Sequence, residues 1–376
     1  MKWLIYKAAV VGLLLSANCV TISAQKTLRE CGFPIGIFDT GKNNAITDVK
    51  GVKVGQLTCI EGDSIRTGVT AIVPHSGNIF RNKVPAAIYI GNGFGKLAGY
   101  TQVKELGNIE TPVVLTNTLS VAVGIEGVVR YTLAQKGNEN VRSVNAVVGE
   151  TNDGKLNKIT QMHVTPEMVM EAIAKADSGV VEQGNVGAGT GTICFGYKGG
   201  IGTSSRVLPA SLGGYTIGVL VQSNYGGVLE IDGVQVGRKL NQYDFRNHVK
   251  KTENVDGSCM MVVVTDAPLD SRNLERLAMR AMMGLAKTGG IASNGSGDYV
   301  IAMSVAEPNL VKDNEPIHNI KVLSNDRMSS LFCATIEATA EALWNSMFMA
   351  ETMEGYRGSK VESLPKEKVL ELLRNR

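Results

Sequence analysis

Short apolar runs rich in β-branched residues recur along the chain, and turn-forming residues bound each of them. This pattern predicts buried strands, because β-branched side chains fit a pleated sheet and glycine or proline ends the run. The predicted strands cover residues 69–74, 86–91, 112–116, 145–149, 215–222, 260–266 and 299–305.

Apolar residues at helical spacing mark three segments between the predicted strands. Thr165 can cap a helix whose first residue is Pro166, and an apolar stripe follows over 169–176. A second amphipathic helix is predicted over 274–285, and a third runs from near 326 to 349. Together these elements predict a layered α/β fold. Strands and helices do not alternate strictly, so a Rossmann order is not supported.

Composition narrows the class of protein. The 376 residues are 44% hydrophobic and include 43 glycines without a collagen period, so disorder and collagen are excluded. A net charge of +3 gives no reason to infer nucleic-acid binding. No repeat or low-complexity linker divides the chain, and a single large domain is expected over 25–376. The polar stretch 241–256 is predicted to be an exposed loop.

The first 24 residues have the features of a secretory signal peptide. Lys2 and Lys7 precede a short apolar segment, and Ala24 ends a cleavage site before Gln25. We therefore expect a periplasmic or secreted protein without a stable membrane span after cleavage. A lipid anchor at Cys19 is a minor alternative, because the asparagine before it is unsuited to lipoprotein processing.

Cysteine, histidine and glycine patterns do not predict a metal or nucleotide site. The cysteines lack any CxxC pair, and no two of the four histidines have metal-ligand spacing. The stretches 91–96 and 187–191 lack the spacing of a Walker loop or a G-x-G-x-x-G motif, so they predict turns or walls of an active site. We expect no metal or organic cofactor.

A serine at the start of an apolar run is the sharpest local feature. Gly257 ends a polar stretch, and Ser258 precedes the strand predicted over 260–266, without a G-x-S-x-G elbow. If the bond between them were cut, the new α-amino group, with a pKa of about 7.7–8.0, could take the proton of the Ser258 hydroxyl. From the local sequence alone, an ordinary loop serine is the stronger interpretation.

A second hydroxyl and a carboxylate stand further along the chain. Ser296 and Asp298 are two residues apart at the entrance of the strand predicted over 299–305, so both could point to one side of a sheet. Such a pair could orient a nucleophile. An ordinary turn is the alternative unless Ser258 lies nearby.

Many segments, in one order over residues 43–355, resemble the L-aminopeptidase/D-esterase family, which includes the β-peptidyl aminopeptidases. The resemblance implies a single αββα domain like that of N-terminal-nucleophile hydrolases, with its own strand connectivity. The matching segments are 44–49, 66–72, 91–95, 110–118, 148–154, 184–191, 256–260, 293–298 and 337–342.

The resemblance also implies that the precursor cuts itself between Gly257 and Ser258. The products would be residues 25–257 and 258–376, held together without a covalent bond. Ser258 would then match the nucleophile of the family.

The remaining site residues follow from the same resemblance. Ser296 and Asp298 match the serine and acid that support the nucleophile. Asn224 matches the side-chain donor of the oxyanion hole, and Glu150 matches the acid that holds the α-ammonium group of the substrate. Asn152 stands near it, where some members carry tyrosine, and is a further candidate for substrate binding.

The leading hypothesis is an exported, self-processing serine aminopeptidase that acts through an acyl-enzyme on short peptides, amino-acid amides or esters. The preferred residue could be an L-, D- or β-amino acid, and the resemblance implies homo-tetramers of processed protomers. One alternative is an acyltransferase resembling ornithine acetyltransferase, although that family uses threonine as its nucleophile. Another is a non-catalytic periplasmic binding protein with the same fold.

Overall fold

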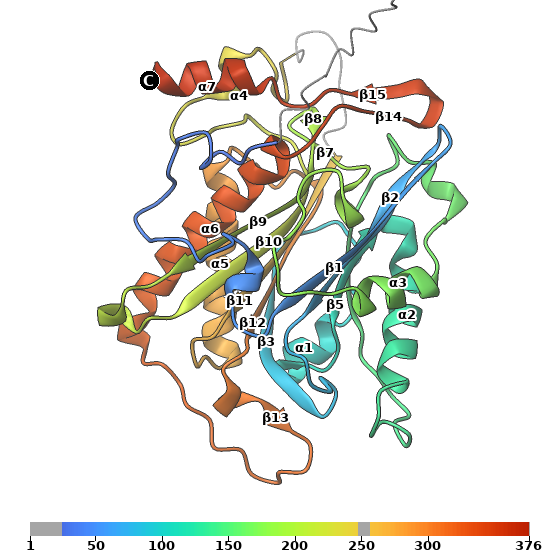
Figure 1. The fold of residues 1–376 in the computed structure, drawn as a ribbon, viewed down its shortest axis with the longest axis vertical. Coiled ribbons are helices and arrows are strands. Elements are labelled where there is room, and N and C mark those ends of the chain that lie inside the picture. The colour runs from blue at the N-terminus through green and yellow to red at the C-terminus, as the bar shows by residue number, and fades with distance from the viewer. Residues whose placement is uncertain (1–24, 247–255, 376) are drawn as a thin grey trace, which may run out of the picture.

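Two stacked β-sheets form the centre of the protein in the computed structural model, which describes residues 25–246 and 256–375 (Figure 1). The larger sheet has the order β13-β3-β12-β11-β10-β9, and β4 pairs with β3 outside this path. Strands β11 and β12 are parallel, and the other pairs are antiparallel. The bounds are β3 Asn82–Gly93, β4 Asn108–Ile109, β9 Gly200–Val207, β10 Thr216–Asn224, β11 Asp256–Thr265, β12 Gly295–Ser304 and β13 Val311–Lys312.

The smaller sheet has four strands in the order β1-β2-β5-β6. Only its β5–β6 pair is parallel. The bounds are β1 Lys53–Glu61, β2 Ile65–Val73, β5 Val113–Asn117 and β6 Val147–Thr151. Two short hairpins complete the strands: β7 Ile193–Cys194 with β8 Tyr197–Lys198, and β14 Met353–Gly355 with β15 Ser359–Val361.

Helices cover the outer face of each sheet (Figure 1). The larger sheet packs against α5 and α6, and the smaller sheet against α2 and α3. The bounds are α1 Tyr100–Leu106, α2 Val121–Leu133, α3 Pro166–Ala174, α4 Val236–Lys239, α5 Ser271–Lys287, α6 Met328–Phe348 and α7 Lys366–Arg374. The predicted αββα sandwich is therefore confirmed.

Alternation along the strands builds three apolar layers. In β11, Met260 and Val262 face the layer between the sheets, whereas Cys259 and Met261 face α5 and α6. A third layer lies between the smaller sheet and its helices. Strand β11 is therefore buried on both faces, which explains its continuous apolar run.

The predicted elements correspond closely to the observed ones. All seven predicted strands are present as parts of β2, β3, β5, β6, β10, β11 and β12. Thr165 caps α3, where its hydroxyl oxygen accepts a hydrogen bond from the Met168 N–H at 3.3 Å. One difference concerns the start of β11, which begins at Asp256 rather than 260 because pairing with β10 and β12 extends it beyond the apolar run.

The predicted signal peptide lies outside the described residues, as does the segment 247–255 of the predicted loop. Among the residues that are described, no helix is long and apolar enough to cross a membrane.

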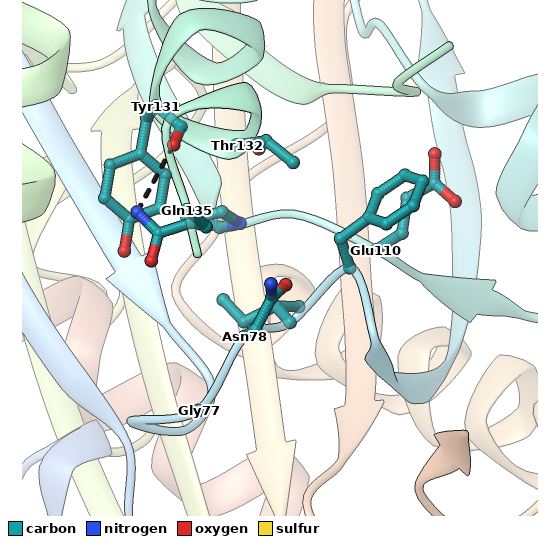
Figure 2. Close-up of a pocket in the computed structure, with 9 residues that line it drawn as sticks. Gly77, Asn78, Glu110, Tyr131, Thr132 and Gln135 are labelled. Atoms are coloured by element: carbon teal, nitrogen blue, oxygen red, sulfur yellow. Dashed lines mark hydrogen bonds between the residues drawn. The ribbon is translucent and has the colours of Figure 1, made fainter. Parts of the chain in front are cut away.

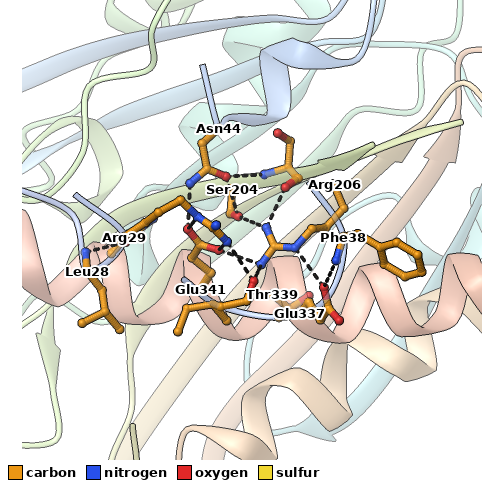
Figure 3. Close-up of polar contacts among 12 residues, drawn as sticks. Leu28, Arg29, Phe38, Asn44, Ser204, Arg206, Glu337, Thr339 and Glu341 are labelled. Atoms are coloured by element: carbon orange, nitrogen blue, oxygen red, sulfur yellow. Dashed lines mark hydrogen bonds and ion pairs between the residues drawn. The ribbon is translucent and has the colours of Figure 1, made fainter. Parts of the chain in front are cut away.

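A buried ionic cluster connects distant parts of this fold (Figure 3). Arg206 of β9 donates to Glu337 at 3.1 Å and to Glu341 at 2.6 Å, and both carboxylates belong to α6. Arg29, near the start of the described chain, donates to Glu341 at 2.8 Å, and Asn44 donates to it at 2.7 Å. The N-terminal segment, β9 and α6 are thereby held together.

Candidate active site

Ser258 is the third residue of β11 and lies between two neighbouring strands. It pairs with Asn224 of β10 on one side and with Gly297 of β12 on the other. Its side chain is buried, and strand alternation places it on the same face as Met260, toward the layer between the sheets. Its Oγ donates to the Gly257 carbonyl oxygen at 2.6 Å.

Glycines on both sides of Ser258 let other segments approach the serine closely. A Cβ at Gly257 would lie 3.1 Å from the Tyr225 Cα, and one at Gly297 would lie 3.0 Å from the Gly95 Cα. Both spaces are tighter than a side chain normally accepts, so glycine permits the close packing of these segments around the serine.

Ser296 and Asp298 lie on the neighbouring strand β12. Ser296 is in register with Gly257, and Asp298 with Cys259, which faces the helices. By strand alternation their side chains therefore point to the opposite face of the sheet from the Ser258 side chain. In the described chain, Ser296 Oγ and both carboxylate oxygens of Asp298 are buried and make no hydrogen bond of good geometry, although the Ser296 hydroxyl and the Cys259 N–H lie close enough to the carboxylate to lower its pKa.

Burial has an electrostatic effect on this carboxyl group. It raises the pKa of Asp298 from 3.8 to about 6, and the nearby Ser296 hydroxyl and the Cys259 backbone N–H offset only part of that rise. The site thus contains a costly, incompletely satisfied acid next to the strand that bears Ser258.

Asn224 ends β10 directly opposite Ser258. Its Oδ1 accepts a hydrogen bond from the Ile193 N–H at 2.9 Å. Since the oxygen is engaged there, the amide nitrogen is the end that can donate toward the serine. Side chains of directly paired residues lie about 4.5–5.5 Å apart at Cβ, so Asn224 and Ser258 are neighbours on one face of the sheet.

Glu150 lies on the smaller sheet, whose strand β6 packs against the strand that bears Ser258. It is buried on β6, where its Oε1 accepts from the Lys96 N–H at 3.0 Å and its Oε2 accepts from the Thr118 hydroxyl. The adjacent Gly149 packs against Met260, two residues beyond Ser258. Strand β6 therefore packs against β11 close to the position of Ser258.

Asn152 has a different environment. Its side chain is exposed, and its Oδ1 accepts from the Gly154 N–H at 2.8 Å within its own turn. Its role in substrate binding stays a prediction.

Comparison with known proteins shows the family to which this chain belongs. The family model described as peptidase family S58 matches residues 44–361. A β-peptidyl aminopeptidase from Sphingosinicella microcystinivorans is 37% identical over 393 residues, which span 100% of this chain and 98% of that relative. The chain belongs to peptidase family S58.

Solved structures agree with the fold of this S58 peptidase. The PH0078 protein from Pyrococcus horikoshii has a TM-score of 0.86 and 45% identity, over 93% of this chain and 99% of that one. The L-aminopeptidase D-Ala-esterase/amidase from Ochrobactrum anthropi, described as a variant of the Ntn-hydrolase fold, has a TM-score of 0.85 and 34% identity, over 93% and 98%. The resemblance recognised in the sequence is confirmed, and the protein is a peptidase.

Two buried titratable groups of the S58 peptidase were not among the predicted site residues. Burial raises the pKa of Asp153 to about 7, and one of its carboxylate oxygens has no hydrogen-bond partner in the described chain. Burial also lowers the pKa of Lys198 to about 7, with the charge of Asp153 opposing the shift. No local motif indicates that either residue is buried, so the sequence does not single out Lys198 as a candidate site residue. Asp153 lies within the matched segment 148–154 but was not singled out.

Figure 2 shows a pocket lined by Glu110, Tyr131 and Gln135. Glu110 precedes the start of β5, whereas Asn117 and the residue paired with Glu150 lie at the other end of that strand. Glu110 is the buried acidic residue of this pocket, and the Oε1 atom of Glu110 accepts a hydrogen bond from the Asn145 N–H at 2.8 Å. The S58 peptidase therefore keeps this carboxylate remote from Ser258, which makes it a useful control. In the described ranges 25–246 and 256–375, no cluster of side chains could hold a metal ion.

Proposed function

We propose that this S58 peptidase is a self-processing serine aminopeptidase whose nucleophile is released by cleavage between Gly257 and Ser258. One observation carries the proposal: Ser258 Oγ lies 2.6 Å from the Gly257 carbonyl oxygen. The hydroxyl is therefore already beside the carbonyl group that it must attack, as proximity catalysis requires.

Self-processing needs only the chain and water. Ser258 Oγ bonds to the Gly257 carbonyl carbon, and its proton moves to the Ser258 nitrogen as the C–N bond breaks. The resulting ester is hydrolysed by water, which leaves a carboxylate at Gly257 and a free hydroxyl and α-amino group at Ser258.

The unpaired groups on β12 support the proposal. Before cleavage, Ser296 Oγ and the Asp298 oxygens are buried without partners in the described chain. An α-ammonium group at Ser258 would appear between the positions with which they are in register. It would supply the missing donors and remove the cost of leaving these atoms unsatisfied.

The same groups can perform hydrolysis of a substrate. The Ser258 α-amino group accepts the hydroxyl proton while Oγ attacks the first amide carbonyl of the substrate. The Asn224 amide nitrogen donates to the developing oxyanion. The proton then passes to the leaving amine, and water hydrolyses the acyl-enzyme with release of the first residue.

Glu150 is proposed to select substrates with a free α-ammonium group. Its two oxygens are oriented by Lys96 and Thr118, and both keep lone pairs for a charged donor. The names of the relatives, which include β-peptidyl and L-aminopeptidases, support short peptides, amides and esters as substrates, with β- and D-residues among the candidates.

Export and assembly are further parts of the proposal. The signal peptide over 1–24 would be removed in the periplasm or on secretion, and the processed protomers would form homo-tetramers. N-terminal sequencing of exported protein tests the first point, with Gln25 and Ser258 as the expected termini. Size-exclusion chromatography with light scattering tests the second, and a monomer would contradict it.

Denaturing gels and activity assays test the central claim. Wild-type protein should give two fragments and hydrolyse amino-acyl p-nitroanilides, whereas Ser258→Ala should stay intact and inactive. Ser329→Ala, which changes an exposed serine of the same fragment, is the matched control and should behave as wild type. An intact, active Ser258→Ala protein would disprove the mechanism. Acetyl transfer without peptide hydrolysis would favour the acyltransferase alternative.

A further inference from the structure

Lys198 is completely buried on β8, yet the described chain contains no salt bridge to it. Its Nζ donates to the Gly189 carbonyl oxygen at 3.0 Å and to the Gly199 carbonyl oxygen at 2.9 Å. Burying an amine whose hydrogen bonds go to two carbonyl groups, with the charge of Asp153 nearby but no ion pair in the described chain, costs free energy, which favours a specific role over simple space filling.

These two hydrogen bonds brace a tight segment of backbone. The segment runs from Gly189 to Ile193, and its Thr192 hydroxyl also donates to the Gly189 carbonyl at 3.0 Å. The Gly199 N–H donates to the Thr192 carbonyl at 3.1 Å. Lys198 therefore joins both ends of the turn that leads into β7 and out of β8 (Figure 1).

The braced segment reaches the site through one hydrogen bond. Ile193 is in register with Lys198, and its N–H is the group that binds Asn224 Oδ1 at 2.9 Å. If this N–H moved away, the two ends of the Asn224 amide could exchange. An oxygen would then face the hydroxyl of Ser258 in place of a donor.

We propose that Lys198 is a positioning residue that keeps the Ile193 N–H in place and thereby aims the Asn224 amide nitrogen at the oxyanion. The inference rests on the proposed function, because it gives Asn224 the oxyanion role. Lys198 itself does not touch the substrate.

The bracing does not depend on the charge of Lys198. Burial lowers its pKa to about 7, so both protonation states are accessible near neutral pH. A neutral amine still carries two N–H bonds, which equals the number of carbonyl groups that it serves.

The test is a double-mutant cycle with Lys198→Met, Asn224→Ala and the double variant, with kcat and KM measured per Ser258 N-terminus. Asn224→Ala should lower kcat by about 100- to 1,000-fold, the usual effect of losing an oxyanion donor. Lys198→Met should lower kcat by about 10- to 100-fold and change KM by less than about 2-fold, because the lost interaction belongs to the transition state. Lys136→Met, an exposed lysine at a distance, is the control and should not change either value.

The double variant decides between the interpretations. If Lys198 acts through Asn224, the double variant should be no slower than Asn224→Ala alone. An equal fold-loss from Lys198→Met in both backgrounds would overturn the positioning role and leave the proposed function intact. A wild-type kcat in Asn224→Ala would instead overturn the oxyanion assignment, and the positioning role with it.

A milder variant protects the test against misfolding of Lys198→Met. Thr192→Val keeps the side-chain shape and removes only the hydroxyl bond to Gly189, so kcat should fall by about 2- to 10-fold, the range for one neutral hydrogen bond. The loss should again disappear in the Asn224→Ala background. If a variant remains unprocessed, the rate at which the 258–376 fragment appears replaces kcat, with the same expectations. Persistence of the loss without Asn224 would contradict the inference.

Discussion

Two buried polar clusters of this S58 peptidase differ in how completely they are satisfied. Arg206 uses all five of its N–H donors, on Glu337, Glu341, Ser204 and two backbone carbonyl groups (Figure 3). Beside Ser258, the buried oxygens of Ser296 and Asp298 have no hydrogen-bond partner in the described chain. The saturated cluster fits a structural role, whereas the unsatisfied one fits the proposed site, in which cleavage would supply the partner.

The two clusters also affect their acids in opposite directions. Burial alone would raise the pKa of Glu341, but hydrogen bonds from Arg29 and Asn44 and the charges of Arg206 and Arg29 hold it below its ordinary value. The pKa of Asp298 is raised to about 6, because burial has no nearby cation to oppose it. The cost of removing a carboxylate from water is thus offset at Glu341 but not at Asp298.

Both clusters relate to the bond that we propose is cut. The acids of the Arg206 cluster lie after Ser258, and Arg29, Asn44 and Arg206 lie before it. This cluster would therefore hold the two fragments together after processing, while the other would use the new amino group.

The largest expected effect comes from Asp298→Asn. It should lower the rates of processing and peptide hydrolysis by about 10²–10⁴-fold, the range for groups that assist proton transfer. The free energy of unfolding should not fall, because a buried, unpaired acid is removed. Gel time courses and urea unfolding measure the two effects.

Asp266→Asn is the matched control, at the other end of β11, where the carboxylate accepts a hydrogen bond from the Thr216 N–H at 2.8 Å. The Asp266→Asn protein should cleave itself and hydrolyse peptides at the wild-type rates. Wild-type rates in Asp298→Asn as well would remove the contrast between the clusters.

Arg206→Met should show the reverse pattern. Glu337 would lose its cation and Glu341 would keep only Arg29, so the free energy of unfolding should fall by about 3–5 kcal/mol. The activity of the protein that remains folded should persist, and the processed fragments should separate more readily in size-exclusion chromatography.

Arg130→Met breaks a surface ion pair with Glu126 and serves as the control. Its effect on the free energy of unfolding should be about 0–1 kcal/mol. If Arg206→Met were no worse than this control, the structural role of the cluster would be refuted.

Glu150→Gln should weaken recognition of the α-ammonium group while keeping its shape. A hydrogen bond to a charged group contributes about 1.5–3 kcal/mol, so KM should rise by about 10- to 100-fold with a smaller change in kcat. Glu110→Gln, in the remote pocket of Figure 2, is the matched control and should not change KM. Equal effects in both variants would argue against a recognition role.

The smallest effect is a pH dependence. In the uncleaved Ser258→Ala protein, Asp298 binds its proton more tightly folded (pKa about 6) than unfolded (about 3.8). Its contribution to the free energy of unfolding therefore falls as pH rises between these values, by up to about 1.4 kcal/mol per pH unit.

Urea unfolding of Ser258→Ala and of Ser258→Ala with Asp298→Asn, from pH 4 to 6.5, measures this contribution as a difference in slope. Glu341 contributes with the opposite sign, since its lowered pKa stabilises the folded state at higher pH. Identical slopes in the two proteins would show that Asp298 is already paired before cleavage.

Local patterns were sufficient for much of the fold. Short apolar runs bounded by turn residues predicted seven strands, and helical spacing predicted α3, α5 and α6. The hydrophobic pattern did not predict strand β9, because its buried residues include Thr203, Ser204 and Ser205. These residues are polar but hydrogen-bonded in the fold. A hydrophobicity pattern does not detect burial that depends on such partners.

The sequence by itself determined the layered class, the family resemblance and the serine at the start of a strand. The tertiary structure decided that Asn224 lies opposite Ser258 and that Asp298 has no hydrogen-bond partner in the described chain. It also decided that the buried Lys198 donates to the Gly189 and Gly199 carbonyl groups, next to the segment whose Ile193 N–H binds Asn224. The physical reason is that strand register and burial arise from pairing between residues far apart in the chain, which no local spacing specifies.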